Sequence, residues 1–313
     1  MNSNLIADIL KFKKEKDAII MAHYYQHNDI QDIADFVGDS LALAQESAKT
    51  SAKIIILAGV HFMGETAKII CPEKRVFVPD MNAGCSLADS CQPDDFKEFI
   101  LKHPDHIVVS YVNTSAEIKA LTDIVVTSTN AKFIIDSLPK DAKIIFGPDK
   151  NLGNYINSVT NRNMVLWDGA CHVHEKFSLE KILELKKLYP QAELISHPEC
   201  KKSLLLISDF IGSTASLLDY TIKSNKTDFI VATESGILHQ MRTHNPFKNF
   251  IPAPPNDSSC ACNDCEFMKL NSLEKIYNCL ALESNEIIIN EALRLKAYSS
   301  ISKMLELSAK MIK

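Results

Sequence analysis

An internal repeat in three copies restricts the fold of this 313-residue chain more than any other feature. Each copy has an apolar strand that ends in polar residues, a second short strand, and a helix whose start carries a serine. The polar strand ends fall at intervals of 88 and 86 residues, at His23, Tyr111 and His197. The serines follow 16 or 17 residues later in each copy, at Ser40, Ser128 and Ser213. This register favours a true triplication over the chance recurrence that alternating strands and helices produce.

Strand and helix signals alternate along the whole chain. Short runs rich in Ile and Val, such as 53–60 and 143–149, lie between segments with helical periodicity, such as 93–103 and 178–190. Alternation of this kind predicts an α/β protein with mainly parallel sheets. Continuously apolar strands predict sheets that are covered on both faces. The apolar run 203–213 is interpreted as one of these strands.

We therefore expect three homologous three-layer αβα domains with parallel sheets, arranged around a pseudo-threefold axis. The expected boundaries are 1–86, 87–171 and 172–265, followed by a helical segment at 266–313. In parallel α/β domains the functional groups gather at the carboxyl ends of the strands. The polar strand ends of the three copies are therefore expected to face one centre.

Three helix starts, near Ser40, Ser128 and Ser213–Thr214, are expected to face the same centre. The free N–H groups at a helix start bind carboxylate or phosphate, which predicts a small anionic ligand. In a plainer interpretation each serine only caps its helix, which contributes about 1 kcal/mol. That interpretation explains one serine well and three serines in register less well.

Composition excludes several other classes of protein. A hydrophobic fraction of 46% and a charged fraction of 23% are ordinary for a globular protein. The net charge of −5 and the absence of a basic stripe with aromatic residues argue against a nucleic-acid-binding protein. No apolar run approaches the roughly 20 residues that span a membrane. The segment 1–17 has the pattern of an amphipathic helix rather than a signal peptide, so we expect a cytoplasmic protein.

The nine cysteines are many for a chain in a reducing cytosol, where clustered cysteines indicate a metal site or catalysis more often than disulfides. Cys85 and Cys171 are 86 residues apart, and the third copy ends in Cys260, Cys262 and Cys265. One cysteine from each copy would place three thiolates at the centre, where they suit zinc or an iron–sulfur cluster. A [4Fe–4S] cluster held by three cysteines keeps one iron free to act as a Lewis acid.

Other interpretations of the cysteines stay open at this point. Cys85 and Cys171 could simply be buried in a core, as free cysteines often are. The last three cysteines alone could hold zinc and stabilise a binding module. The chain could also be an iron–sulfur electron carrier, although the polar strand ends would then have no purpose. The remaining cysteines are expected to be packing residues: Cys71, Cys91, Cys200 and Cys279.

Several longer segments resemble the quinolinate synthase family, which are iron–sulfur enzymes of NAD biosynthesis. The segments run from residue 22 to the C-terminal helices, and together they are highly specific. They are AHYYQ at 22–26, QDIADFVGDSLALA at 31–44, GVHFMGETAKI at 59–69, YVNTSAEIKALTDIVVTSTNA at 111–131, FGPDKNLG at 146–153, HPEC at 197–200, DFIGSTASL at 209–217 and TESGILH at 233–239. A final Cys-x-x-Met-x-x-Asn-x-Leu pattern runs from Cys265 to Leu273.

The resemblance implies one [4Fe–4S] cluster per chain, at the centre of three domains, with Cys85, Cys171 and Cys265 as its ligands. Cys265 is preferred over its neighbours because the family's last ligand precedes Met, Asn and Leu at these offsets. The implied reaction is a transfer that condenses iminoaspartate with dihydroxyacetone phosphate to give quinolinate, phosphate and two waters. Transient contact with an aspartate-oxidising enzyme is a further hypothesis. A related iron–sulfur hydro-lyase acting on another hydroxy acid is the alternative.

The resemblance also implies roles for residues at the strand ends and helix starts. Tyr25 and Glu199 are implied as acid–base groups, and Tyr111 and Asn113 as groups that hold the substrate. The residues implied to bind carboxylate or phosphate oxygens are His23, Ser40, Ser128, His174, His197, Ser213 and Thr214. A disulfide between Cys262 and Cys265 would remove a cluster ligand, so redox control by this pair is a separate hypothesis.

Overall fold

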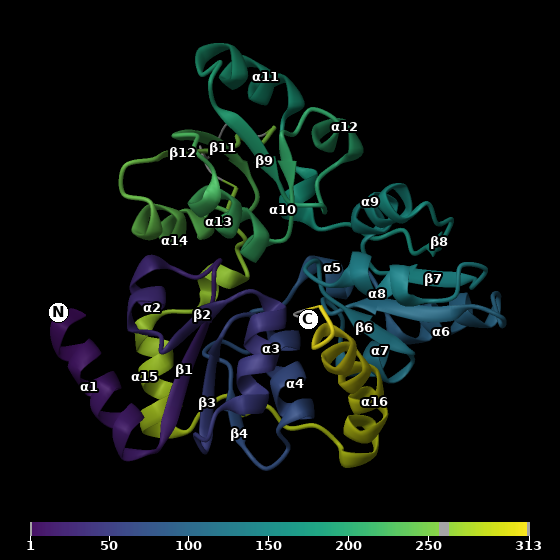
Figure 1. Ribbon diagram of the computed structural model, residues 1–313. Helices are drawn as coiled ribbons and strands as arrows, with labels where there is room; N and C mark the ends of the chain where they lie inside the picture. The colour runs from purple at the N-terminus through teal and green to yellow at the C-terminus, as the bar shows by residue number, and fades with distance from the viewer. Residues whose placement is uncertain (1, 257–262, 312–313) are drawn as a thin grey trace.

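Three four-stranded parallel sheets form the framework of the computed structural model, which describes residues 2–256 and 263–311. Their strand orders are β2-β1-β3-β4, β6-β5-β7-β8 and β10-β9-β11-β12. Each sheet has the same order once its strands are numbered from one to four, and every strand pair in it is parallel. The predicted fold class, with three repeated αβα units, is confirmed (Figure 1).

Each repeat alternates four strands with helices. The first contains β1 Ala18–His23, α2 Asn28–Ile33, β2 Phe36–Gly38, α3 Ser40–Lys49, β3 Ile54–Ala58, α4 His61–Ile70, β4 Arg75–Phe77 and α5 Ser86–Asp89. The second contains α6 Pro93–Leu101, β5 Ile107–Tyr111, α7 Ala116–Ala120, β6 Ile124–Val126, α8 Ala131–Ser137, β7 Ile144–Gly147, α9 Lys150–Thr160, β8 Val165–Leu166 and α10 His172–Glu175. The third contains α11 Leu179–Leu188, β9 Glu193–Ser196, α12 Lys202–Leu205, β10 Phe210–Ile211, α13 Thr214–Lys223, β11 Asp228–Ala232, α14 Ile237–His244 and β12 Asn249–Pro252.

The central strands are short and almost fully buried, as their composition predicts. All five residues of β3 are buried, and β7 is buried along its whole length. β-Branched side chains suit such strands because they pack well on a pleated surface. Helices cover both faces, so no face of these sheets needs polar side chains.

The prediction of a single strand over 203–213 is wrong. This run begins with the helix α12, and the strand β10 contains only Phe210 and Ile211. The other two repeats have a short helix at the same place, α2 and α7. A short apolar run does not distinguish a buried helical turn from a buried strand, so periodicity alone could not separate the two.

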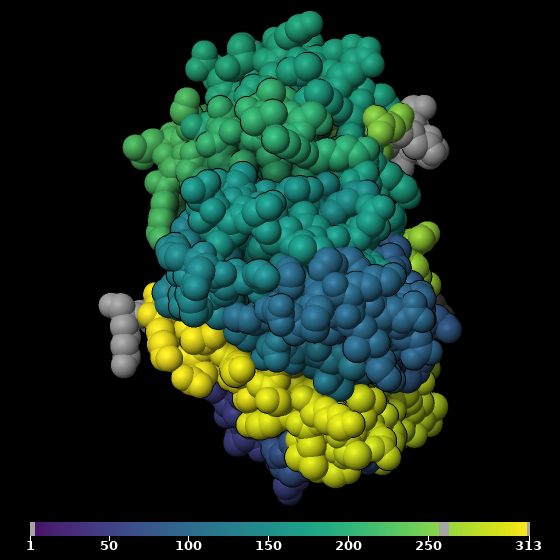
Figure 2. Space-filling model, turned by 90° about the vertical axis from the view of Figure 1, so that its right-hand side faces the viewer, coloured from purple at the N-terminus to yellow at the C-terminus, as the bar shows by residue number. Residues whose placement is uncertain are grey.

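Two helices that follow the three repeats pack against the first and second repeats. The helix α15 Leu273–Leu282 packs against the N-terminal helix α1 Asn2–Glu15 and the strand β3. The helix α16 Glu291–Ser308 packs against α4 of the first repeat and against α7 and β6 of the second. Figure 2 shows this segment, in yellow, lying along the second repeat, in blue. Across the described ranges, none of the helices combines the length and the apolar character needed to cross a membrane.

The helix starts of the three repeats meet at a common centre, although two of the three helices are not capped by the predicted serine. In α3 the cap is Asp39, whose side chain accepts from Ala42 N, and Ser40 is the first helical residue. In α13 the cap is Ser213, as predicted. The third helix, α8, begins at Ala131, three residues after Ser128. Ser128 therefore lies in the turn before its helix rather than at the helix start.

Candidate active site

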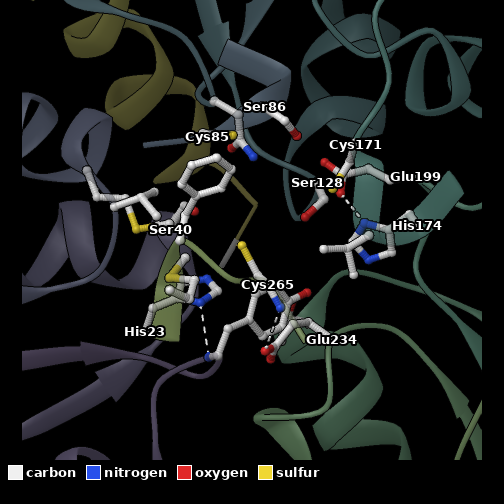
Figure 3. Close-up of a pocket in the computed structure, with 18 of the residues that line it drawn as sticks. His23, Ser40, Cys85, Ser86, Ser128, Cys171, His174, Glu199, Glu234 and Cys265 are labelled. Carbon is white, nitrogen blue, oxygen red and sulfur yellow. Dashed lines mark hydrogen bonds and ion pairs between the residues drawn. The ribbon is translucent and has the colours of Figure 1, made fainter. Parts of the chain in front are cut away.

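A cavity lies where the carboxyl ends of the first strands of the three sheets converge (Figure 3). Residues of all three repeats line it, together with residues that follow the third repeat. The lining contains all but one of the side chains singled out from the sequence: His23, Tyr25, Ser40, Cys85, Tyr111, Asn113, Ser128, Cys171, His174, His197, Glu199, Thr214 and Cys265. The structure therefore brings together groups that are up to 242 residues apart in the chain, such as His23 and Cys265.

Ser213 is the residue that the cavity lining lacks. Its hydroxyl accepts from Ser216 N at 3.3 Å, which is the capping bond of α13, and it is buried beside the cavity. Ser213 Oγ also lies 2.8 Å from Thr129 Oγ1, whose other neighbour is Asp39 Oδ2 at 2.6 Å. The three side chains come from the turns between the second strand and the following helix of the three repeats. They form a junction at the edge of the cavity, which we call the axial junction (Asp39, Thr129 and Ser213).

The three cysteines have the same local setting. Cys85 immediately precedes α5, Cys171 immediately precedes α10, and Cys265 lies three residues before the 3₁₀ helix η1 Met268–Leu270. Main-chain N–H groups of the following turn hydrogen-bond to each thiol, which favours the thiolate. Burial has the larger effect, raising the pKa of Cys85 to about 12 and of Cys265 to about 11. Because the protein alone does not stabilise three thiolates here, the donor set fits a bound metal that supplies the compensating charge.

A carboxylate and an imidazole stand beside one of these sulfurs. Donor atoms of Cys171, His174 and Glu199 all lie within 4.8 Å of one another, so the group could hold a metal ion. Glu199 Oε2 is 2.7 Å from His174 Nδ1 and 3.5 Å from His197 Nδ1. Glu199 Oε1 is buried and has no hydrogen-bond partner among the described residues. This unsatisfied oxygen indicates that a ligand of the cavity completes its coordination.

The ionisation of Glu199 follows from these contacts. Burial alone would raise its pKa, but the charges of His174 and His197 and hydrogen bonds from His174 and Tyr111 outweigh burial, and the pKa falls to about 2. The carboxylate therefore stays ionised at neutral pH. His23 has the opposite environment, because burial together with His197 and Lys269 lowers its pKa to about 3 and keeps the ring neutral.

Two tyrosines are held as neutral hydroxyls. The hydroxyl of Tyr25 lies 2.8 Å from Thr214 Oγ1 and 2.8 Å from Thr233 Oγ1. Burial is the main cause that raises the pKa of Tyr25 and of Tyr111 well above 10. Each phenol therefore keeps its proton at neutral pH and can donate a hydrogen bond. Asn113 lies two residues after Tyr111, and its Oδ1 is buried without a partner in the described chain.

Five polar residues of the lining were not predicted: Asp39, Ser86, Thr127, His172 and Glu234. Ser86 Oγ lies 2.5 Å from His172 Nδ1. These two residues directly follow Cys85 and Cys171, so the spacing of 86 residues that relates the cysteines carried the signal for both. Glu234 lies within the segment TESGILH, whose resemblance was noted without a role for the carboxylate. Cys260 and Cys262, and with them the zinc-module and disulfide hypotheses, lie outside the described residues.

Comparisons with known proteins identify the relatives of this chain. A family model described as "Quinolinate synthetase A protein" matches residues 7–306. Curated proteins named quinolinate synthase are similar over 305 residues: 55% identity in Chloroherpeton thalassium, covering 97% of this chain and 95% of the relative, and 57% in Trichormus variabilis, covering 97% and 94%. The protein of the same name in Synechocystis sp. is 56% identical, covering 97% and 96%. Such whole-length matches do not favour the alternatives of a hydro-lyase or an electron carrier. The chain therefore belongs to the quinolinate synthase family of enzymes.

Proposed function

We propose that this chain catalyses the condensation of iminoaspartate with dihydroxyacetone phosphate to quinolinate, phosphate and two waters, as a step of NAD biosynthesis. Membership of the family supports the activity. The observation in the structure that carries the proposal is the convergence of three cysteines, one from each repeat or its end, on a cavity that also holds Glu199 and Tyr25. The identity of the two substrates rests on the family resemblance.

The cavity suits two anionic reactants. The helices α3 and α13 begin at its wall, and Ser40 and Thr214, their first residues, line it. Helix starts favour bound carboxylate or phosphate because their N–H groups are free. His197 Nε2 of the third repeat lies 3.2 Å from Ser128 Oγ of the second repeat, so an imidazole and a hydroxyl lie together at the cavity. We assign the binding of carboxylate and phosphate oxygens to these groups, with His23 and His174.

The cofactor that we propose is one [4Fe–4S] cluster, held by Cys85, Cys171 and Cys265. Three partly buried thiols at the N-terminal ends of three helical turns fit such a group. When bound through three cysteines, the cluster supplies an iron with an open position that acts as a Lewis acid. The donor group of Cys171, His174 and Glu199 supports the assignment of this chemistry to the wall of the cavity that they form.

The remaining chemistry requires protons to be moved at the reacting carbons, and two residues are placed for it. We assign proton acceptance to the Glu199 carboxylate, whose Oε2 lies 2.7 Å from His174 Nδ1. Tyr25 is neutral and donates a proton, with its hydroxyl fixed by Thr214 and Thr233. Tyr111 and Asn113 hold the substrate, and the free Oδ1 of Asn113 is available to accept from it.

Three further assignments belong to this proposal. The domains are 1–86, 87–171 and 172–265, with the helical segment 266–313 joining the first two, since α16 packs against α4 and α7. The chain acts in the cytoplasm. An aspartate-oxidising enzyme is the source of iminoaspartate and contacts this chain transiently.

The test combines metal analysis with a product assay. Protein purified or reconstituted without oxygen is expected to contain four irons and four sulfides per chain and to form quinolinate from the two substrates. One zinc per chain, or a full iron–sulfur complement without quinolinate formation, would overturn the proposal. Release of one phosphate per quinolinate tests the proposed loss of phosphate in the reaction.

A further inference from the structure

A buried ion pair outside the catalytic assignments lies between the third repeat and the segment that follows it. Glu234, just after β11, is fully buried, and its Oε1 is 2.9 Å from Lys269 Nζ. Lys269 lies in η1, four residues after Cys265. Burying two charges costs hydration energy that their mutual attraction only partly offsets, so such a pair is weak evidence for stability by itself. Its other contacts indicate what it does.

Each member of the pair holds the main chain of a residue assigned to the active site. Glu234 Oε1 accepts from Cys265 N at 3.2 Å, and its Oε2 accepts from Gly236 N at 2.7 Å. Lys269 Nζ donates to Tyr25 O at 2.7 Å. A continuous path therefore runs from the main chain of Cys265 through one carboxylate and one ammonium group to the main chain of Tyr25.

Tyr25 also fits tightly against the same part of the third repeat. A Cβ atom on Gly236 would lie 2.8 Å from Tyr25 Cα, so only glycine permits this approach. Gln31 Nε2 donates to Gly236 O and to Tyr24 O, both at 3.0 Å, and closes the contact from the side of the first repeat. The position of Tyr25 therefore depends on how the residues around Glu234 are held.

We propose that Glu234 and Lys269 are a positioning pair that fixes Cys265 and Tyr25 relative to each other. The same two charges set the third cluster ligand and the proton-donating tyrosine in place across the contact between the first and third repeats. This inference rests on the roles proposed above for Cys265 and Tyr25. Both carboxylate oxygens of Glu234 are occupied by main-chain or lysine donors, so the pair acts through its neighbours.

The experiment measures the alkylation of Cys265 in the iron-free, full-length protein, by peptide mapping after brief exposure to iodoacetamide. Glu234→Gln removes the carboxylate charge beside the partly exposed Lys269, and Lys269→Met leaves the buried Glu234 without its lysine partner. Each is expected to speed the alkylation of Cys265 about tenfold, to lower the iron bound on reconstitution, and to lower kcat more than it raises KM. Lys269→Arg keeps the charge and is expected to keep Cys265 protected.

A matched control lies in the third repeat. Lys186 of α11 forms an ion pair with Asp209 at 2.8 Å, and neither residue lines the cavity, so Lys186→Met is expected to leave Cys265 protected and the iron content unchanged. The double variant Glu234→Gln/Lys269→Met is expected to differ little from either single variant, because the two groups act as one unit.

The inference is overturned if Cys265 is alkylated at the wild-type rate in both charge-removing variants, whatever their stability. It is also overturned if Lys186→Met exposes Cys265 as much as Lys269→Met does. Neither readout depends on turnover. A wild-type protein that forms no quinolinate would reject the proposed function, while the alkylation rates would still report on the pair.

Discussion

Thr129 Oγ1 lies 2.6 Å from Asp39 Oδ2 and so connects the second repeat to the cap of the helix α3 in the first. The same oxygen is 2.8 Å from Ser213 Oγ, the cap of α13 in the third repeat. Because caps fix where a helix begins, the axial junction ties the positions of the helix starts to one another. The residues after these caps, Ser40 and Thr214, line the cavity.

Replacing Thr129 by valine tests the axial junction, since the shape is kept and the hydroxyl is lost. Asp39 is buried and would lose a hydrogen-bond partner, so the free energy of unfolding is expected to fall by about 1–3 kcal/mol. Denaturant unfolding measures this loss, and steady-state kinetics is expected to show a higher KM. Thr243→Val, on an exposed helix face, is the control and should change neither quantity.

Removal of the charge of Glu199 is expected to separate cofactor binding from catalysis. Glu199→Gln should keep its iron and sulfide, because the three cysteines are unchanged, and should lose at least about a hundredfold in kcat, since the amide does not accept a proton. Glu193→Gln is the control at the other end of β9, where Glu193 accepts from the Tyr220 hydroxyl at 2.7 Å. Wild-type turnover in Glu199→Gln would remove this residue from the acid–base chemistry.

Single loss of any of the three converging thiols is expected to prevent metal loading. Cys85→Ala, Cys171→Ala and Cys265→Ala should each show iron near background after anaerobic reconstitution and no quinolinate formation. Cys279→Ala is the matched variant, because Cys279 is buried in α15 away from the cavity, against Val78 O at 3.8 Å. Full iron content in any of the first three variants would contradict the ligand assignment.

A buried lysine predicts a pH dependence of stability. Burial lowers the pKa of Lys119 to about 8, although Glu65, Cys85 and Glu117 favour its charged form. In an unfolded chain a lysine titrates near pH 10.4, so between about pH 8 and about pH 10 the unfolded state binds more protons than the folded state. The free energy of unfolding of the wild type should therefore rise over this range relative to Lys119→Met, by up to about 3 kcal/mol.

Denaturant unfolding of the iron-free proteins across that range measures the difference. Subtracting the variant from the wild type cancels the titration of the cysteines, whose pKa values burial raises to about 11 or 12. Lys143→Met, at an exposed position, is the control and should follow the wild type at every pH. A difference that does not change with pH would contradict the assigned burial of the charge.

The fold was largely predictable because its signal is repeated three times and lies in the order of apolar runs. The central strands β3 and β7 agree with their predicted runs to within a few residues. The prediction for 203–213 was wrong because a buried helical turn and a buried strand present the same apolar side chains. The structure has short helices, α2 and α7, at the places in the other two repeats that correspond to α12.

The site was predictable where strand ends carry the chemistry, because carboxyl ends of parallel strands meet at one edge. Ser213 shows the limit: spacing places its hydroxyl near the centre but does not decide whether it points into the cavity or back to its own helix. Glu234 and Lys269 show a second limit. Their partner Tyr25 is more than 200 residues away, and the contact depends on how the first and third repeats pack.

A homotrimer of one αβα unit would present three copies of each side chain at its axis. In this chain the equivalent strand ends present His23, Tyr111 and His197. Two residues after each of these lie Tyr25, Asn113 and Glu199. Covalent fusion has allowed each position to diverge on its own. The result is an asymmetric pocket inside a nearly symmetric scaffold, able to tell one end of a reactant from the other.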